Sequence, residues 1–208
     1  MEMTCEECNV CKQISAETNS TERVTTELAQ STTNNDPAKI ELLIVGESPY
    51  PTSPVPEFAF CKPTWLEQVE YNCCGRLVLC SLGIKLEKVS NKYPYPKNMF
   101  EDLTNKGIIF QNLYLELNKD KSPSRKHKNP KIDNLTSKAS KVVLCGRETH
   151  IIAQEKSDFI CAIHPAARCR DYCQEWKKFW GGKGNLLNLL EPSGSGPIHT
   201  IINNINSL

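Results

Sequence analysis

Four side chains that can do chemistry stand at or just after the ends of apolar runs in this chain. Glu47 and Ser48 follow a run that ends at Gly46, Asn112 lies toward the end of a second run, and His164 follows another. A carboxylate can position water, an imidazole can carry a proton, and an amide offers a donor and an acceptor together. Because open α/β sheets bind ligands at the carboxyl ends of their strands, we expect these side chains to face a ligand crevice.

Four apolar stretches with turn signals behind them predict the strands that position these residues. The stretches are residues 40–45, 108–115, 141–146 and 159–165. Short runs rich in β-branched residues are typical of strands covered on both faces. Helical spacing predicts helices at residues 64–86, 98–105 and 147–154, and one or two helices over residues 172–190, interrupted at Gly181 and Gly182. The pattern predicts the α/β class, as a three-layer α/β/α sandwich with a central, mostly parallel four-stranded sheet.

The length of 208 residues and the hydrophobic content of 39% suit one domain with a full core. Residues 1–36 are rich in Thr, Ser, Asn and Glu, a composition that predicts a disordered tail before a domain at residues 37–208. The tail has seven acidic and two basic residues, a charge of −5, and the whole chain has +1, so the domain carries +6. A basic domain can contact a polyanion.

The chain has 11 cysteines and an N-terminus without the features of a signal peptide, which favours reduced thiols or metal ligands over disulfides. No apolar run approaches the ~20 residues needed to span a bilayer, so we expect a soluble intracellular protein of the cytoplasm or nucleus. Cys5, Cys8 and Cys11 have a spacing that can hold zinc or an iron–sulfur cluster with further ligands. They can equally be free thiols, because no second such pair follows, and the expected cofactor is none.

A basic segment at residues 119–131 follows the second predicted strand. Lys and Arg far outnumber its single Asp, and the segment includes Lys121, Arg125, Lys126 and Lys128. Two interpretations remain open: a solvated surface loop, or a loop whose cations neutralise phosphates beside the expected crevice.

Four separated motifs follow strands in a fixed order. Gly-Glu-Ser-Pro-Tyr-Pro begins at Gly46, Phe60 lies twelve residues after Ser48, Gly-Ile-Ile-Phe-Gln-Asn ends at Asn112, and His-Pro-Ala-Ala-Arg begins at His164. In order and spacing this set resembles the uracil-DNA glycosylase superfamily over residues 38–190. Their counterparts there are the water-activating loop, the aromatic that stacks on the flipped base, the strand whose Asn reads uracil, and the loop that carries a catalytic His.

The resemblance implies a DNA glycosylase that flips a base out of the stack and hydrolyses its glycosidic bond. Phe60 would stack on the base, although Phe58 is an alternative, and Asn112 would read its edge unless it only ends a strand. His164 would stabilise the departing base, unless it is an ordinary loop histidine, and a carboxylate would balance the positive sugar. Arg168 would enter the duplex or bind phosphate, as would Arg170. The implied partner is single- or double-stranded DNA containing a damaged base, bound by a monomer.

The first motif departs from the family pattern. Ser48 stands where the family usually has its catalytic Asp, and a serine is neither an anion nor a base at neutral pH. Glu47 matches the Glu of the iron–sulfur branch, so we assign it the acidic role, with Ser48 as a water ligand. Tyr50 matches the residue that excludes thymine, and Pro51 replaces a family His. The later cysteine pair of the iron–sulfur branch is not found after Asn112.

Three functions therefore compete. The leading hypothesis is removal of uracil or a related altered pyrimidine from DNA, as in base excision repair. The alternative is a catalytically silent member of the same fold that binds nucleic acid or a protein partner, motivated by Ser48 and Pro51. A thiol-rich, metal-dependent protein is the third. The cysteines at positions 61, 73, 74 and 80, and the Trp pair at 176 and 180, are interpreted as core residues.

Overall fold

A computed structural model of the chain describes residues 37, 39–50, 55, 57–120, 122–155, 159–167 and 173–207. The expectations for the tail and its cysteines, and for Lys121, Arg168 and Arg170, fall on residues outside this set. Within the part that the structure describes, every helix is too short or too polar to cross a membrane.

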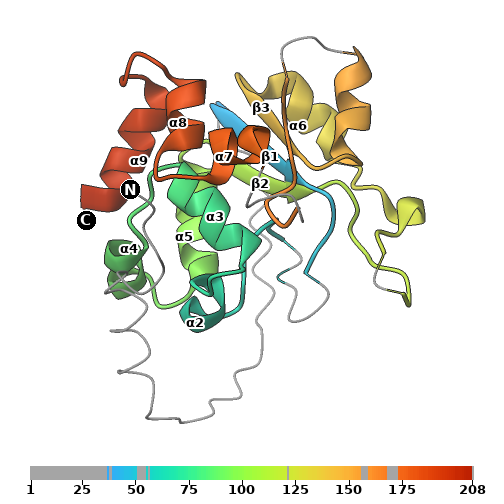
Figure 1. The fold of residues 1–208 in the computed structure, drawn as a ribbon, viewed down its shortest axis with the longest axis horizontal. Coiled ribbons are helices and arrows are strands. Elements are labelled where there is room, and N and C mark those ends of the chain that lie inside the picture. Colours follow the sequence, from blue (N-terminus) through green and yellow to red (C-terminus); the bar gives the residue numbers. More distant parts are fainter. Residues whose placement is uncertain are drawn as a thin grey trace.

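A four-stranded, all-parallel sheet forms the centre of the molecule (Figure 1). Its strands are β1 (Leu42–Gly46), β2 (Ile108–Asn112), β3 (Val142–Cys145) and β4 (Ile160–Ala162), in the order β2-β1-β3-β4. Central β1 is buried along its whole length, as the apolar run predicts. The predicted α/β sandwich is therefore confirmed, and among the described strands every pairing is parallel.

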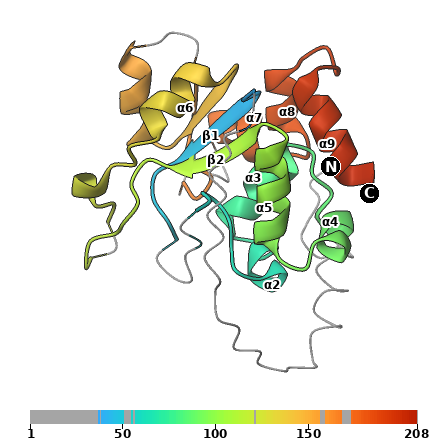
Figure 2. The same ribbon diagram turned by 180° about the vertical axis from the view of Figure 1, so that it is seen from behind.

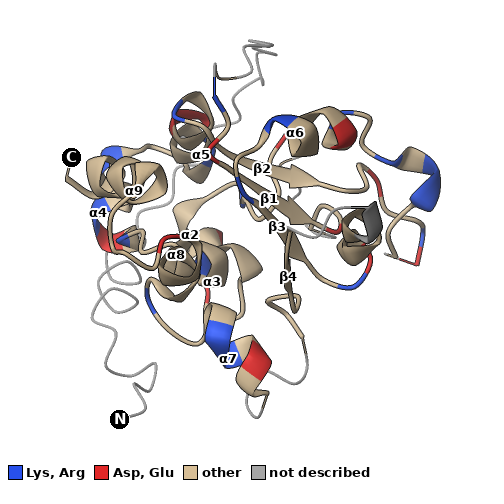
Figure 3. Ribbon diagram, turned by 90° about the horizontal axis from the view of Figure 1, so that it is seen from above, with Lys and Arg blue, Asp and Glu red and all other residues tan. Residues whose placement is uncertain are grey.

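Helices cover both faces of the sheet because side chains alternate between faces along each strand. Leu43 and Val45 pack with α6 (Ile132–Lys138) and the 3-10 helix η3 (Thr149–Glu155). Leu42 and Ile44 belong to the core of the other face. The helices of that face lie on the side of the sheet opposite α6 (Figures 2 and 3). That core is built with α3 (Cys74–Ser81), α4 (Leu86–Lys92), α5 (Pro96–Asn105), α7 (Gln174–Trp180), α8 (Asn185–Leu190) and α9 (Pro197–Ser207).

The helix predicted over residues 64–86 is wrong as a single element. It consists of α2 (Trp65–Gln68), α3 and the first residue of α4. Thr64 caps α2 through its side chain, and a turn in which Cys73 N donates to Glu70 O at 2.9 Å separates α2 from α3. Gly83, with φ 81°, follows α3. Apolar spacing continues across these breaks, so periodicity alone does not reveal them.

Three other elements are shorter or tighter than predicted. β2 ends at Asn112 because Tyr114 N donates to Glu47 O at 2.9 Å and Leu115 N then turns to His127 O at 2.9 Å, beside the 3-10 helix η2 (Arg125–His127). β4 keeps three residues of the predicted stretch. The helix predicted over residues 147–154 is the 3-10 helix η3.

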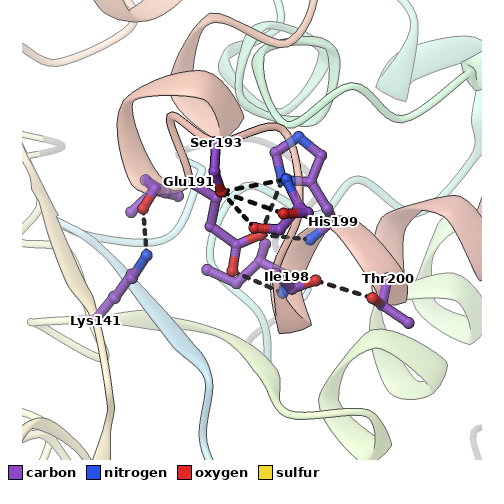
Figure 4. Close-up of polar contacts among 9 residues, drawn as sticks. Lys141, Glu191, Ser193, Ile198, His199 and Thr200 are labelled. Carbon is purple, nitrogen blue, oxygen red and sulfur yellow. Dashed lines mark hydrogen bonds and ion pairs between the residues drawn. The ribbon is translucent and has the colours of Figure 1, made fainter.

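The C-terminal helix α9 begins on a buried carboxylate. Glu191, 5% exposed, accepts hydrogen bonds from Ile198 N at 3.1 Å and His199 N at 2.7 Å, and Oε2 lies 2.8 Å from His199 Nδ1 (Figure 4). The carboxylate satisfies amides that a helix start leaves without partners. Lys141 Nζ donates to the carbonyl of Leu190, which ties the end of α8 to the start of β3.

Candidate active site

The carboxyl ends of all four strands lie along one edge of the sheet because the strands are parallel. Gly46 and Asn112 are register partners at this edge. Glu47 follows β1, Gly146 follows β3, and His164 comes two residues after β4. The sheet therefore brings Glu47, Asn112 and His164 to one edge, as their positions after strands predict.

Asn112 carries a nearly buried amide without a partner. The residue is 3% exposed, and among the described residues its side-chain amide makes no hydrogen bond. The one fully buried, unpaired side-chain polar atom of the described set is Thr104 Oγ1, so both amide atoms of Asn112 reach the surface. A polar group that reaches the surface can be hydrogen-bonded by water or by a ligand. An unpaired amide at this edge is therefore available to a ligand that offers both a donor and an acceptor.

Phe60 lies beside this amide over Gly46. A Cβ at position 46 would lie 3.0 Å from Asn112 Oδ1 and 3.1 Å from Phe60 Cζ. These two side chains therefore approach each other over Gly46, which has no side chain to separate them. Phe60 is 7% exposed. Phe58, the alternative stacking residue, packs against Phe100 with ring centroids 5.7 Å apart. Of the two candidates, Phe60 is the one that contacts the Gly46 site.

Tyr50 is fixed by the first turn of α3. Its Oη accepts a hydrogen bond from Gly75 N at 2.8 Å and lies 3.4 Å from Cys73 Sγ, while Lys62 Nζ lies 3.9 Å from the ring centroid. Burial, and then the neighbouring Cys73 and Cys74, raise the pKa of Tyr50 far above its usual value. The hydroxyl is therefore neutral and occupied, and the ring forms a fixed wall.

Glu47 packs over the end of β3. Its Oε1 accepts a hydrogen bond from Glu148 N at 3.3 Å, and Oε2 accepts none among the described residues. Gly146 makes this possible: it has φ 101°, and a Cβ there would collide with Oε1 and lie 2.8 Å from Glu47 Cδ. The half-buried carboxylate thus has one anchored oxygen and one available oxygen. Its charge also acts on His164.

His164 is held on a loop that two indoles fasten on either side. Trp180 Nε1 donates to Ile163 O at 2.7 Å, and Trp176 Nε1 donates to Pro165 O at 3.0 Å. Nδ1 of His164 accepts a hydrogen bond from Ala166 N at 3.2 Å. Burial lowers the pKa of His164, and the charge of Glu47 opposes this shift. A neutral ring whose Nδ1 is an acceptor carries its proton on Nε2, which is then a hydrogen-bond donor.

The two tryptophans have a role that sequence reasoning missed. Both are buried core residues as predicted, with exposures of 8% for Trp176 and 3% for Trp180. Their i, i+4 spacing places both on one helix face, and a buried indole N–H requires an acceptor. That requirement was the signal that a loop backbone lies against this face.

Ser48 contributes a half-buried hydroxyl beside Glu47. Among the described residues it forms no hydrogen bond. A neutral hydroxyl can hold a water molecule by donating or accepting a hydrogen bond, but it cannot supply the charge of a carboxylate.

Buried Asn129 ties the basic segment to β2. The residue is 3% exposed, and its Nδ2 donates to Asn112 O and Gln111 Oε1, both at 3.0 Å. Its Oδ1 accepts from Lys131 N at 3.0 Å. The basic segment is therefore anchored directly behind the strand end that carries the free amide.

Among the described residues of this segment, Arg125, Lys126 and Lys128 lie at the surface. Arg125 Nη2 lies 2.9 and 3.0 Å from the two carboxylate oxygens of Glu148, Lys128 Nζ lies 3.4 Å from Asp133, and Lys126 is exposed. An open cavity of about 600 Å³ adjoins Arg125. It is lined by Arg125, Arg147, Glu148, His150 and Ile151. Glu148, whose amide anchors the Glu47 carboxylate, is thus also part of the cavity lining. Asn112 and His164 do not line this cavity.

The described cysteines are packing residues for the most part. Cys61, Cys73 and Cys74 are buried as predicted, whereas Cys80 is only half-buried. Burial raises the pKa of Cys74 to about 12, so its thiol is protonated at neutral pH. Among the described residues, no three His, Cys, Asp or Glu side chains form a group that would hold a metal ion.

Known proteins add nothing to this description: no family model, curated protein or solved structure matches the chain. Fold and site together define an α/β sandwich with a carboxylate, an amide and an imidazole along the carboxyl edge of its parallel sheet.

Proposed function

We propose that this protein is a DNA glycosylase that flips out uracil or a related altered pyrimidine and hydrolyses its N-glycosidic bond. The observation that carries the proposal is the unpaired amide of Asn112, which lies 97% buried beside Phe60. A site that reads a base needs an aromatic surface and a two-sided hydrogen-bonding group in the same small space. Asn112 and Phe60, which lie close to each other over Gly46, would supply these two parts.

Base choice follows from the walls of the pocket. The Asn112 amide accepts from the ring N–H of uracil and donates to the neighbouring carbonyl oxygen. In this proposal Tyr50 lies against position 5 of the base, the role that its match to the thymine-excluding residue of the family implies. Its ring is held by the amide of Gly75 and the ammonium group of Lys62. The proposed pocket would then accept uracil and reject thymine.

Glu47 and His164 act on opposite charges of the reaction. The bond from the sugar C1′ to the base nitrogen breaks, its electron pair leaves with the base, and a water oxygen bonds to C1′. Glu47 balances the positive sugar and receives the proton of the water through its available Oε2. The Nε2–H group of neutral His164 donates to the oxygen on which the base gathers negative charge. Ser48 holds the water.

Binding of the DNA strand falls to the basic segment. Arg125, Lys126 and Lys128 are exposed beside β2, anchored through Asn129. Such cations neutralise phosphates and release counterions, so affinity for DNA falls as salt rises. Arg168, Arg170 and Lys121 complete the proposed contacts on DNA.

A second candidate function is a catalytically silent module that binds nucleic acid or a protein partner. Ser48 favours it, because no carboxylate stands at this position to share the charge with Glu47. A silent module that binds nucleic acid shares DNA binding with the glycosylase, so base release is the outcome that separates the two candidates.

Incubation with a uracil-containing oligonucleotide, followed by alkali, separates them. We expect strand scission by the wild type, and a loss of about 10²-fold or more in Glu47→Gln and in His164→Ala. Glu41→Gln is the matched control, because Glu41 pairs with Lys39 at 2.8 Å at the opposite end of β1. Absence of scission at enzyme excess, with DNA binding retained in fluorescence anisotropy, refutes the glycosylase and supports the silent module.

A further inference from the structure

Gln68, at the end of α2, is a fully buried amide whose two ends hold one turn of the chain. The residue is 0% exposed. Its Nε2 donates to Phe60 O at 3.1 Å, and its Oε1 accepts from Lys62 N at 2.7 Å. Thr64 fixes the helix that carries it by accepting from Glu67 N at 3.3 Å and donating to the Glu67 carboxylate at 2.9 Å. The turn of residues 60–62 is thus bracketed by a single side chain.

Phe60 has a backbone conformation that needs such support. Its φ is 65°, and it is the one non-glycine residue with positive φ among those that the structure describes. A bulky residue is an outlier in the left-handed region, and strain of this kind persists where the surroundings hold the chain in place. The direction of the Phe60 side chain depends on this φ. Releasing the turn would therefore swing the ring away from Asn112.

Gly75 brings α3 against the same turn. A Cβ at this position would collide with Phe60 O and Gln68 Nε2, and it would lie 3.1 Å from the carbonyl carbon of Phe60. The Gly75 amide also donates to Tyr50 Oη at 2.8 Å. Tyr50 and Phe60 are the two aromatic walls of the proposed pocket. Both therefore contact the backbone of Gly75, which fixes where they lie relative to each other.

We propose that Gln68 is a positioning residue of the base pocket: it holds Phe60 in the left-handed conformation that places its ring beside the Asn112 amide. Gly75 leaves the space for this arrangement. The inference rests on the proposed function, since it gives Gln68 a part in base recognition. Gln68 itself touches no base, and it acts through Phe60.

Gln68→Met tests the proposal, because it keeps the volume and removes both hydrogen bonds. We expect kcat on a uracil oligonucleotide to fall by about 10- to 100-fold, since a displacement near 1 Å has effects of this size. KM should stay within about twofold, because strand contacts dominate binding. Gln68→Glu, which keeps the acceptor for Lys62 N and loses the donor to Phe60 O, should shift kcat in the same direction if Gln68→Met does not fold.

Val89→Ala is the control for stability alone, because Val89 is 1% exposed in α4, which packs against α9. A kcat for Gln68→Met equal to that of Val89→Ala overturns the inference and leaves the glycosylase standing. An inactive wild type overturns the glycosylase instead. A crystal structure of Gln68→Met tests the positioning role of Gln68 without any measurement of turnover. Phe60 should leave positive φ, and an unchanged φ of 65° refutes the role of Gln68.

Discussion

Gly146→Ala should displace the Glu47 carboxylate without removing it. The added Cβ would collide with Oε1 and lie 2.8 Å from Cδ, where ordinary contacts are 3.4–4 Å, so the carboxylate must move by roughly 1 Å. A displacement of this size lowers a catalytic rate by about 10²-fold. Alanine at φ 101° is also strained, by about 1–2 kcal/mol. For a domain of this size the melting temperature should fall by about 2–8 °C.

Gly83→Ala separates the two effects. Gly83 has φ 81°, so alanine is strained there as well, but its Cβ would meet Leu187 Cδ2 at an ordinary 3.5 Å, far along α3 from the carboxyl edge. Thermal unfolding and single-turnover excision of uracil are measured for both variants. We expect similar losses of melting temperature, with excision lost in Gly146→Ala alone.

Two results would contradict this reasoning. If Gly146→Ala excises uracil within about twofold of Gly83→Ala, the placement of Glu47 does not matter to the reaction. If both variants lose excision equally, the loss follows stability and not the position of the carboxylate. The first outcome counts against the acidic role of Glu47, and the second refutes the claim that Gly146→Ala acts by displacing the carboxylate.

Two further predictions concern titrating groups. Burial tends to raise the pKa of Glu191, but hydrogen bonds from His199 and Ile198 overcome it, so the pKa is lowered. The stabilising contribution of Glu191 is therefore present above the usual Glu value of 4.5 and is lost as pH falls through the lower folded value. The melting temperature of the wild type should fall more steeply below pH 4.5 than that of Glu191→Gln, and parallel curves would count against the α9 anchor. Burial lowers the pKa of His164 and Glu47 raises it, so NMR titration should find a still lower His164 pKa in Glu47→Gln, while an unchanged or higher value would mean that the two side chains do not interact.

The strands were predictable because burial on both faces leaves an unbroken apolar run, as in β1. Their ends were less so. β2 stops at Asn112, three residues early. The amide of Leu113 still bonds to Gly46 O of β1, but those of Tyr114 and Leu115 bond to the loop after β1 and to His127, and such pairing is a property of the folded chain. The helix break between α2 and α3 also depends on contact, since Gln68 turns inward to hold residues 60–62.

Placement of Glu47, Asn112 and His164 at one edge was predictable from strand ends alone. Their surroundings were not. The Trp180 bond to Ile163 O and the Gln68 bond to Phe60 O join residues 17 and 8 positions apart through backbone atoms, which carry no mark in the sequence. Side-chain type shows what a residue can bind, whereas backbone partners become visible only when the chain is folded.

The glycines at two strand ends, Gly46 and Gly146, do more in this fold than allow the chain to turn. Gly146 has positive φ, so its backbone requires glycine, but Gly46 does not, and alanine could adopt its conformation without strain. What position 46 cannot accept is volume, because a Cβ would lie 3.0 Å from Asn112 Oδ1 and 3.1 Å from Phe60 Cζ. Space for a functional side chain is therefore the reason for glycine at this strand end. The same reasoning holds at Gly146, where the space belongs to Glu47.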